Sequence, residues 1–368
     1  MRKLPRAVFD FVDGGAANER TLRANADAFK HWCILPRLSV DTTGRSPAVT
    51  LLGEPSAMPV IIAPTGLAGL IRPQGDIILA KAAAAAGVPF CLSTMSVASL
   101  EDVTSAVPEG NNWFQLYPLR DAGLQDEFLD RAKTAGYRTL CISVDQPTHG
   151  RRLRDNRNNF TVPLRLTLRS FLDFATHPRW SLTALANPVR FGNFPQTSGD
   201  IGSAAQYVNS LFDSCSTWEK LERIRERWQG KLVIKGILVK EDADLACRIG
   251  ADAIVISNHG GRQLDDVPPA AFTLPSVVDT VGGRAEVIID GGVRTGNDLI
   301  KASALGARAC MLGRPGLFGL AAAGAEGARR MLAILEDELN NAMTLMGTRT
   351  LGELTAGSLT QAGRPVKS

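Results

Sequence analysis

The chain has 368 residues, of which 45% are hydrophobic and 21% are charged, a balance typical of a globular protein with a buried core. The net charge of +4 is mild and no basic run carries interleaved aromatic residues, which argues against a nucleic-acid partner. The six cysteines form no CxxC pair and no metal-spaced cluster, so we expect reduced thiols, no metal site and a cytoplasmic location. We expect neither a secretory leader nor a membrane-spanning segment, because no apolar run is long enough for either.

Short apolar runs that end in small or polar residues recur eight times, at 59–62, 90–92, 113–114, 140–142, 232–234, 253–256, 287–289 and 309–312. Helical patterns lie between several of them, at 75–86, 122–135, 240–249 and 296–305, and a further helix is predicted over 321–342. Strands that are apolar throughout and alternate with helices predict an α/β fold with a parallel sheet covered on both faces. Eight such units predict a closed (β/α)8 TIM barrel, and a doubly wound open sheet is the second architecture that fits.

The predicted strand ends carry a hydrogen-bonding group in every case. In a (β/α)8 barrel the chemistry lies at the carboxyl ends of the strands. Eight polar ends together predict a large polar ligand. These end residues are Pro64, Thr65, Gly66, Ser93, Gln115, Tyr117, Ser143, Asp145, Lys235, Ser257, His259, Asp290, Gly291, Gly292, Arg294, Gly313 and Arg314.

The last two strand ends predict a phosphate site. Gly291 and Gly292 with Arg294, followed by Gly313 and Arg314, offer free backbone N–H groups and two guanidinium groups. This is the place where such barrels bind phosphate, after the seventh and eighth strands.

The segment 257–265, with the sequence SNHGGRQLD, predicts a catalytic site. His259 can exchange a proton near neutral pH, and Arg262 can grip a carboxylate with two parallel hydrogen bonds. Gly260 and Gly261 allow the chain to turn tightly between them.

With these motifs in place, the chain resembles the FMN-dependent α-hydroxy-acid oxidase and dehydrogenase family, which includes (S)-mandelate dehydrogenases and bacterial membrane L-lactate dehydrogenases. APTG at 63–66, FQLY at 114–117, DGGVRTG at 290–296 and LGRP at 312–315 stand in the family's order around SNHGGRQLD. The resemblance runs from about residue 4 to about residue 354. It implies one FMN-binding domain over 1–368, a homotetramer, and oxidation of an (S)-2-hydroxy acid to the 2-keto acid.

The resemblance also implies residue roles in binding FMN. Lys235 would lie near flavin N1 and stabilise the anionic reduced flavin. The other flavin-ring contacts would come from Pro64, Thr65, Gly66, Ser93, Gln115, Ser143 and Ser257. The ribityl chain and phosphate would be held by Asp290, Gly291, Gly292, Arg294, Gly313 and Arg314.

For catalysis, the resemblance implies that His259 is the base, taking either the Cα proton or the hydroxyl proton, with Asp145 stabilising its imidazolium form. Arg152 and Arg262 would bind the substrate carboxylate. Tyr117 would contact the substrate oxygens.

Three residues in the expected substrate pocket bear on the substrate. Phe11 stands where most relatives have a tyrosine that donates to the carboxylate, a bond worth about 1.5–3 kcal/mol. Gly66 stands where oxidases tend to have alanine, and Met95 is smaller and more flexible than the tryptophan of glycolate oxidase. These residues favour a bulky, aryl substrate and a dehydrogenase. The alternative is an oxidase of the lactate, glycolate or hydroxymandelate type that reduces oxygen to hydrogen peroxide.

A long insertion over 155–215 follows the fourth predicted strand. Between Phe160 and Phe194 it combines aromatic residues with Arg165, Arg169, Arg179 and Arg190, which suits a membrane interface. The family resemblance implies a peripheral anchor on the inner face of the cell membrane and a quinone as electron acceptor. A lid over the active site is the other interpretation, and the two are compatible. Of the remaining histidines, we expect His31 and His177 at the surface and His149 at the edge of the pocket.

Two other classes of function remain open from the residues alone. One is a non-redox phosphate-binding barrel, such as an isomerase or aldolase. The other is a flavin-binding protein without catalysis, against which the intact set of His259, Asp145, Arg262 and Arg152 argues.

Overall fold

The computed structural model describes residues 3–159, 167–194, 207, 210–214 and 216–363. Eight parallel strands close into a barrel in which neighbours in sequence are neighbours in space, so the (β/α)8 prediction is confirmed and the open sheet is wrong. The strands are β4 (Val60–Ile62), β5 (Phe90–Ser93), β6 (Asn112–Leu116), β7 (Thr139–Ser143), β8 (Lys231–Ile237), β9 (Ala253–Ile256), β10 (Glu286–Asp290) and β11 (Ala309–Leu312).

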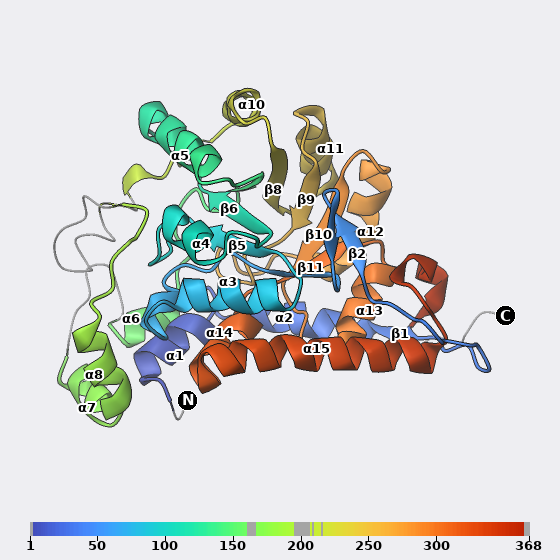
Figure 1. The fold of residues 1–368 in the computed structure, drawn as a ribbon, viewed down its shortest axis with the longest axis horizontal. Helices are drawn as coiled ribbons and strands as arrows, with labels where there is room; N and C mark the ends of the chain where they lie inside the picture. Colours follow the sequence, from blue (N-terminus) through green and yellow to red (C-terminus); the bar gives the residue numbers. More distant parts are fainter. Residues whose placement is uncertain (1–2, 160–166, 195–206, 208–209, 215, 364–368) are drawn as a thin grey trace.

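Helices surround this barrel (Figure 1). Those that follow the strands are α3 (Gly75–Ala85), α4 (Leu100–Ala106), α5 (Ala122–Thr134), α10 (Trp218–Arg227), α11 (Lys240–Arg248), α12 (Ala270–Val281), α13 (Gly296–Ala304) and α14 (Arg314–Ala323). The chain begins with α1 (Arg6–Asp13), α2 (Arg20–Ala28) and the 3-10 turn η1 (Phe29–His31), and α15 (Ala325–Met346) runs beneath the barrel in the view of Figure 1. The short elements are η2 (Ala68–Leu70), η3 (Leu351–Glu353), η4 (Ala356–Ser358) and the antiparallel pair β1 (Trp32–Ile34) and β12 (Leu359–Gln361).

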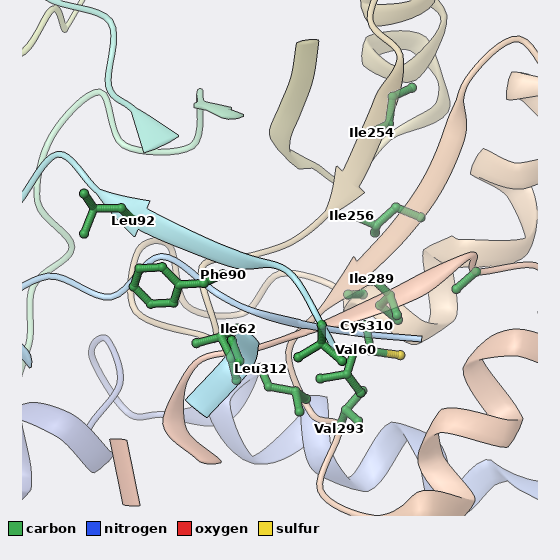
Figure 2. Close-up of a cluster of buried hydrophobic side chains, with 14 of the residues drawn as sticks. Val60, Ile62, Phe90, Leu92, Ile254, Ile256, Ile289, Val293, Cys310 and Leu312 are labelled. Carbon is green, nitrogen blue, oxygen red and sulfur yellow. The ribbon is translucent and has the colours of Figure 1, made fainter. Parts of the chain in front are cut away.

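The barrel strands divide the core into two layers because successive side chains of a strand point to opposite faces. Ile61, Cys91, Trp113 and Met311 belong to the buried cluster inside the barrel. Their sequence neighbours face the helices instead and form the outer cluster, part of which Figure 2 shows, with Val60, Ile62, Phe90, Leu92, Ile254, Ile256, Ile289, Cys310 and Leu312. Cys91, Cys141 and Cys310 are buried free thiols, as expected.

A hairpin of β2 (Val49–Leu51) and β3 (Glu54–Ser56) seals the amino-terminal end of the barrel. Leu51 and Leu52 are buried in the inner cluster, and the Leu52 N–H donates to Glu286 Oε1 at 3.0 Å, at the start of β10. The carboxyl ends of the strands therefore remain as the end at which a ligand site can form.

The predicted helix over 321–342 is wrong as a single element, because the chain breaks at Gly324 between α14 and α15. Gly324 has φ +61° and ψ −131°, a conformation open to glycine and not helical. The two helices then pack closely: a Cβ on Gly327 would lie 2.0 Å from the Gly319 carbonyl oxygen. The sequence gives no sign of this turn, because the alanines and glycines on both sides of Gly324 continue the same apolar spacing.

The insertion after β7 contains α6 (Leu153–Arg157), α7 (Leu168–Ala175) and α8 (Pro178–Ala186). Figure 1 shows α7 and α8 as a helical pair at the edge of the molecule. Asp173 Oδ2 accepts from the Arg6 N–H at 2.7 Å, and Trp180 Nε1 donates to the Leu70 carbonyl at 2.8 Å, so the pair is tied to α1 and η2. Among the helices of the described residues, none has the length and apolar character needed to cross a bilayer.

Candidate active site

One cavity at the carboxyl ends of the strands brings together most of the residues predicted from the sequence. Its lining includes Phe11, Pro64, Thr65, Gly66, Ser93, Met95, Tyr117, Arg152, Lys235, His259, Arg262, Asp290, Gly291, Gly292, Arg294, Gly313 and Arg314. His149 lies at this cavity too, as expected from its place before Arg152.

Four predicted site residues stand behind the lining instead of in it: Gln115, Ser143, Asp145 and Ser257. Gln115 Oε1 accepts from Ser93 Oγ at 3.2 Å, and Asp145 Oδ1 lies 3.0 Å from His259 Nδ1. Ser143 is buried at the end of β7, in register with Lys235 of β8. These residues therefore support side chains that line the cavity.

His259 and Asp145 form a half-buried acid–imidazole pair. His259 has φ +57°, and Gly260 and Gly261 follow it with φ +64° and +73°, so the loop after β9 holds three consecutive left-handed residues. A Cβ on Gly261 would lie 2.6 Å from the Leu22 N atom, so this close turn requires glycine. Burial raises the pKa of Asp145, but the charges of His259 and Lys235 outweigh it and hold that pKa below its usual value. Asp145 is therefore an anion facing the imidazole.

Lys235 supplies a fixed positive charge beside this pair. Its Nζ lies 2.9 Å from Asp290 Oδ2 and 3.0 Å from Ser257 Oγ, and Ser257 Oγ donates to Asp290 Oδ2 at 2.7 Å. Burial alone would lower the pKa of Lys235, but the carboxylates of Asp290 and Asp145 outweigh it and raise that pKa. The ammonium group therefore stays charged while almost fully buried.

Two further positive charges, those of Arg152 and Arg262, lie around the Phe11 ring. The guanidinium carbons of Arg262 and Arg152 lie 5.2 and 5.6 Å from the centre of the Phe11 ring. Arg262 Nη1 also donates to the carbonyls of Phe11 and Gly14, at 2.8 and 2.9 Å, at the end of α1. Burial, and then the charges of Arg152 and Arg314, lower the pKa of Arg262, so an anion bound here would relieve repulsion among the arginines.

The predicted phosphate end has the expected backbone and a different arginine arrangement. Gly291 and Gly292 have φ +102° and +88°, so the loop after β10 adopts glycine-specific turns at the cavity wall. Arg314 donates to three backbone carbonyls, those of Val12, Gly14 and Gly260, at 2.9–3.2 Å. Burial, and then Arg294, lower the pKa of Arg314 to about 10. Its contact with a phosphate therefore stays a prediction.

One buried hydrogen-bond donor without a partner fits a ligand that carries an acceptor. Within the described residues, Gln115 Nε2 is buried and has no hydrogen-bond acceptor, while its Oε1 is held by Ser93. A buried unpaired amide is costly, so it fits a ligand that brings an acceptor such as a ring carbonyl. A flavin has such carbonyls, and the glycine turns and arginines at the other end suit its phosphate.

The sequence matches the family model described as FMN-dependent dehydrogenase over residues 1–361. The chain belongs to the FMN-dependent dehydrogenase family. This FMN-dependent dehydrogenase is 43% identical over 367 residues to an L-lactate dehydrogenase of Xanthomonas euvesicatoria pv. vesicatoria (strain 85-10), covering 98% of the chain and 94% of the relative. It is 41% identical over 364 residues to a putative L-lactate dehydrogenase of Mycobacterium tuberculosis (strain ATCC 25618 / H37Rv), covering 99% of the chain and 87% of that relative.

Solved structures of the same family superpose over nearly the whole dehydrogenase. The monotopic membrane protein (S)-mandelate dehydrogenase has a TM-score of 0.94 at 37% identity, covering 98% of this chain and 96% of the other. Mandelate oxidase with (S)-2-phenylpropionate has a TM-score of 0.82 at 37% identity, covering 97% and 94%. The protein is thus an FMN-dependent oxidoreductase with the TIM-barrel fold of its family.

Several residues of the cavity wall were not predicted from the sequence. Leu67, Gln146, Gln263, Leu317 and Phe191 line the cavity of this dehydrogenase. Four of them lie next to predicted strand-end segments and could have been found from that proximity. Phe191 belongs to the insertion, far along the chain from any strand end, and only the Gly192–Asn193 turn that follows it is a local signal.

Proposed function

We propose that this enzyme oxidises an (S)-2-hydroxy acid with an aryl or other bulky substituent to the 2-keto acid and passes the electrons to a quinone. The observation that carries the proposal is the convergence of the His259–Asp145 pair, the buried Lys235 and two arginines on one cavity. Lactate and mandelate, named in the relatives, are both 2-hydroxy acids, which supports this substrate class.

The arginines account for binding of the carboxylate. Arg152 and Arg262 carry guanidinium groups at the cavity wall, and guanidinium binds carboxylate through paired charge-assisted hydrogen bonds. In our proposal Tyr117 donates its hydroxyl to a substrate oxygen. Burial, and then the Asp145 charge, raise the pKa of Tyr117, so the phenol keeps its proton.

The imidazole accounts for the proton that the substrate loses. His259 Nδ1 faces Asp145 Oδ1, which leaves Nε2 to accept a proton from Cα or from the hydroxyl group. Asp145 stabilises the resulting imidazolium as its counter-charge. FMN, when bound, would accept the two electrons that the hydroxy acid loses when it becomes the keto acid. Lys235 would hold a fixed positive charge beside the cofactor and stabilise the negative charge that the cofactor gains on reduction.

The residues that we assign to FMN itself line the cavity or stand directly behind its lining. The ring would be held by Pro64, Thr65, Gly66, Ser93, Gln115, Ser143, Lys235 and Ser257. The ribityl chain and phosphate would be held by Asp290, Gly291, Gly292, Arg294, Gly313 and Arg314.

The insertion supports peripheral contact with the inner face of the cell membrane. Phe171, Leu172, Leu182 and Leu185 on α7 and α8 are between 57% and 81% exposed, an unusual apolar face for a helical pair. Of the four arginines predicted to face the membrane, Arg179 and Arg190 are exposed. Arg165 lies outside the described residues, and only the backbone of Arg169 is described. The neighbouring structure of a monotopic membrane protein supports this assignment. We also propose that residues 1–368 form one domain, with 155–215 as an insertion in it. We propose a homotetramer as the assembly.

The electron acceptor separates the proposal from its alternative, an oxidase; mandelate oxidase, a structural neighbour, supports keeping that alternative. A dehydrogenase converts a 2-hydroxy acid and a quinone into a 2-keto acid and a quinol, whereas an oxidase converts the acid and oxygen into the keto acid and hydrogen peroxide. Turnover of (S)-mandelate is measured in air with and without a short-chain ubiquinone. We expect quinone-dependent turnover and little peroxide. One peroxide formed per keto acid, at a rate unchanged by quinone, would assign the oxidase.

A further inference from the structure

We infer that Phe191 of the insertion is the specificity-determining wall against which the substituent on C2 of the substrate packs. This inference rests on the proposed function. Phe191 is 2% exposed and is one of the residues that line the cavity, so this buried side chain is part of the cavity wall. Among the described residues of the 155–215 insertion, Phe191 alone lines this cavity.

A short strap, defined here as Phe191–Phe194, fixes the position of this ring. Asn193 Nδ2 donates to the carbonyls of Ser93 and Thr94 at 3.3 and 3.2 Å and to Ser96 Oγ at 3.0 Å. Its Oδ1 accepts from the Leu100 N–H at 2.9 Å. One buried asparagine therefore joins the strap to the end of β5 and to the start of α4.

The strap lies so close to the barrel that only glycine fits at its second position. The Gly192 N–H donates to the Ser96 carbonyl at 3.0 Å. A Cβ on Gly192 would lie 2.4 Å from Ala98 C and 2.4 Å from Ser99 N, which are backbone atoms that cannot move aside cheaply. The sequence Phe-Gly-Asn thus supplies a ring, a close approach and an anchor in three consecutive residues.

Phe191 belongs to an apolar wall built from three separate loops. The Leu67 N–H donates to the Met95 carbonyl at 3.1 Å, which ties the end of β4 to the end of β5. A Cβ on Gly66 would lie 3.0 Å from Met95 Cβ, so these two loops are in close contact. The strap joins the same β5 loop on either side of Met95. Met95, Leu67 and Phe191 therefore form one apolar surface in a cavity whose lining also carries polar and charged side chains.

The chemistry of the two surfaces orients the substrate. Arg152 and Arg262 take the carboxylate, and His259 must reach the carbon or oxygen beside it. The remaining substituent on C2 then falls to the apolar surface. An aromatic ring such as Phe191 favours a flat aryl group or a branched alkyl group, since rings pack edge to face or offset against one another. A methyl group is too small to fill this surface.

The test uses the FMN-loaded enzyme and binding of two acids that cannot be oxidised, (S)-2-phenylpropionate and propionate. Binding is followed through the change in the flavin absorption spectrum. We expect Phe191→Ala to weaken 2-phenylpropionate about 10- to 100-fold and propionate less than threefold. Phe191→Leu, the milder variant, is expected to move both in the same direction by less.

Phe194→Leu is the matched control, because Phe194 lies in the same strap and packs on Phe128, at 5.3 Å between ring centroids, and does not line the cavity. It should leave both affinities unchanged. Equal losses for both acids in Phe191→Leu, or no loss for the aryl acid, would overturn the inference. The proposed function fails differently: no 2-hydroxy acid would then bleach the flavin of the unaltered enzyme, whatever the two affinities.

Discussion

Replacing Asp145 by asparagine isolates the charge that we assign to stabilising the imidazolium of His259. Asp145 Oδ1 lies 3.0 Å from His259 Nδ1, and Asp145 Oδ2 is buried without a donor in the described part of the chain. Asparagine has the same shape, so its Oδ1 can keep the bond to the Nδ1–H of the histidine. The substitution then removes the charge and keeps the geometry.

The magnitude follows from two bounds. A hydrogen bond to a charged group is worth about 1 kcal/mol more than a neutral one, and two unit charges about 4 Å apart at an effective dielectric constant of 20 interact by about 4 kcal/mol. Since 1.4 kcal/mol is tenfold in rate, Asp145→Asn should slow flavin reduction by roughly 10- to 1000-fold. His259→Ala should slow it by at least as much.

The assay is anaerobic stopped-flow reduction of the bound flavin by (S)-mandelate, with FMN content as the check on folding. If Asp145 acts only through the imidazole, the double variant Asp145→Asn/His259→Ala should be no slower than His259→Ala alone. An Asp145→Asn enzyme within twofold of the parent would refute the reasoning. A full additional loss in the His259→Ala background would refute it as well.

Three further results are expected. Phe11→Tyr restores a hydroxyl beside Arg152 and Arg262 and should lower the KM for L-lactate about tenfold or more in steady-state assays; an unchanged KM would mean that the ring alone orders the arginines. Burial raises the pKa of Asp76 to about 6, above its value in the unfolded chain. Protonated Asp76 therefore stabilises the fold below about pH 4, and this stabilisation is lost as the pH rises through 6. The Tm of Asp76→Asn relative to the parent should therefore increase from pH 4 to pH 7, and a constant difference would contradict the shift. The double variant Leu182→Asp/Leu185→Asp should co-sediment less with anionic vesicles than the unaltered enzyme does. The control Ile334→Asp changes an exposed residue on α15 and should bind as the unaltered enzyme does. Equal binding by the unaltered enzyme and both variants would exclude α8 as the membrane contact.

The barrel was predictable from sequence because its strands are continuously apolar and end in polar residues. The run ending at Ile256, followed by the Ser257–His259 segment, shows both signals within seven residues, and the structure has β9 and a cavity-lining loop at those positions. The break at Gly324 was not predictable in the same way. Its glycine continues an alanine-rich helical pattern, and only the packing of α14 on α15 requires the turn.

The site was predictable as far as single strand ends determine it. His259 and Tyr117 each follow a strand of their own and Lys235 lies near the carboxyl end of β8, so the barrel alone brings them to one cavity. Two features depend on contacts between distant segments, which no local pattern specifies. Arg314 donates to carbonyls at the end of α1, almost the whole chain away, and Phe191 reaches the cavity through the hydrogen bonds of Asn193.

The measurement that tests the central claim most directly is the visible spectrum of the purified holoenzyme, kept without oxygen, before and after addition of (S)-mandelate. We expect an oxidised flavin band that is lost rapidly when the acid is added, with benzoylformate formed in equal amount. A yellow protein that neither (S)-mandelate nor L-lactate bleaches would contradict the assignment of the cavity to oxidation of a 2-hydroxy acid.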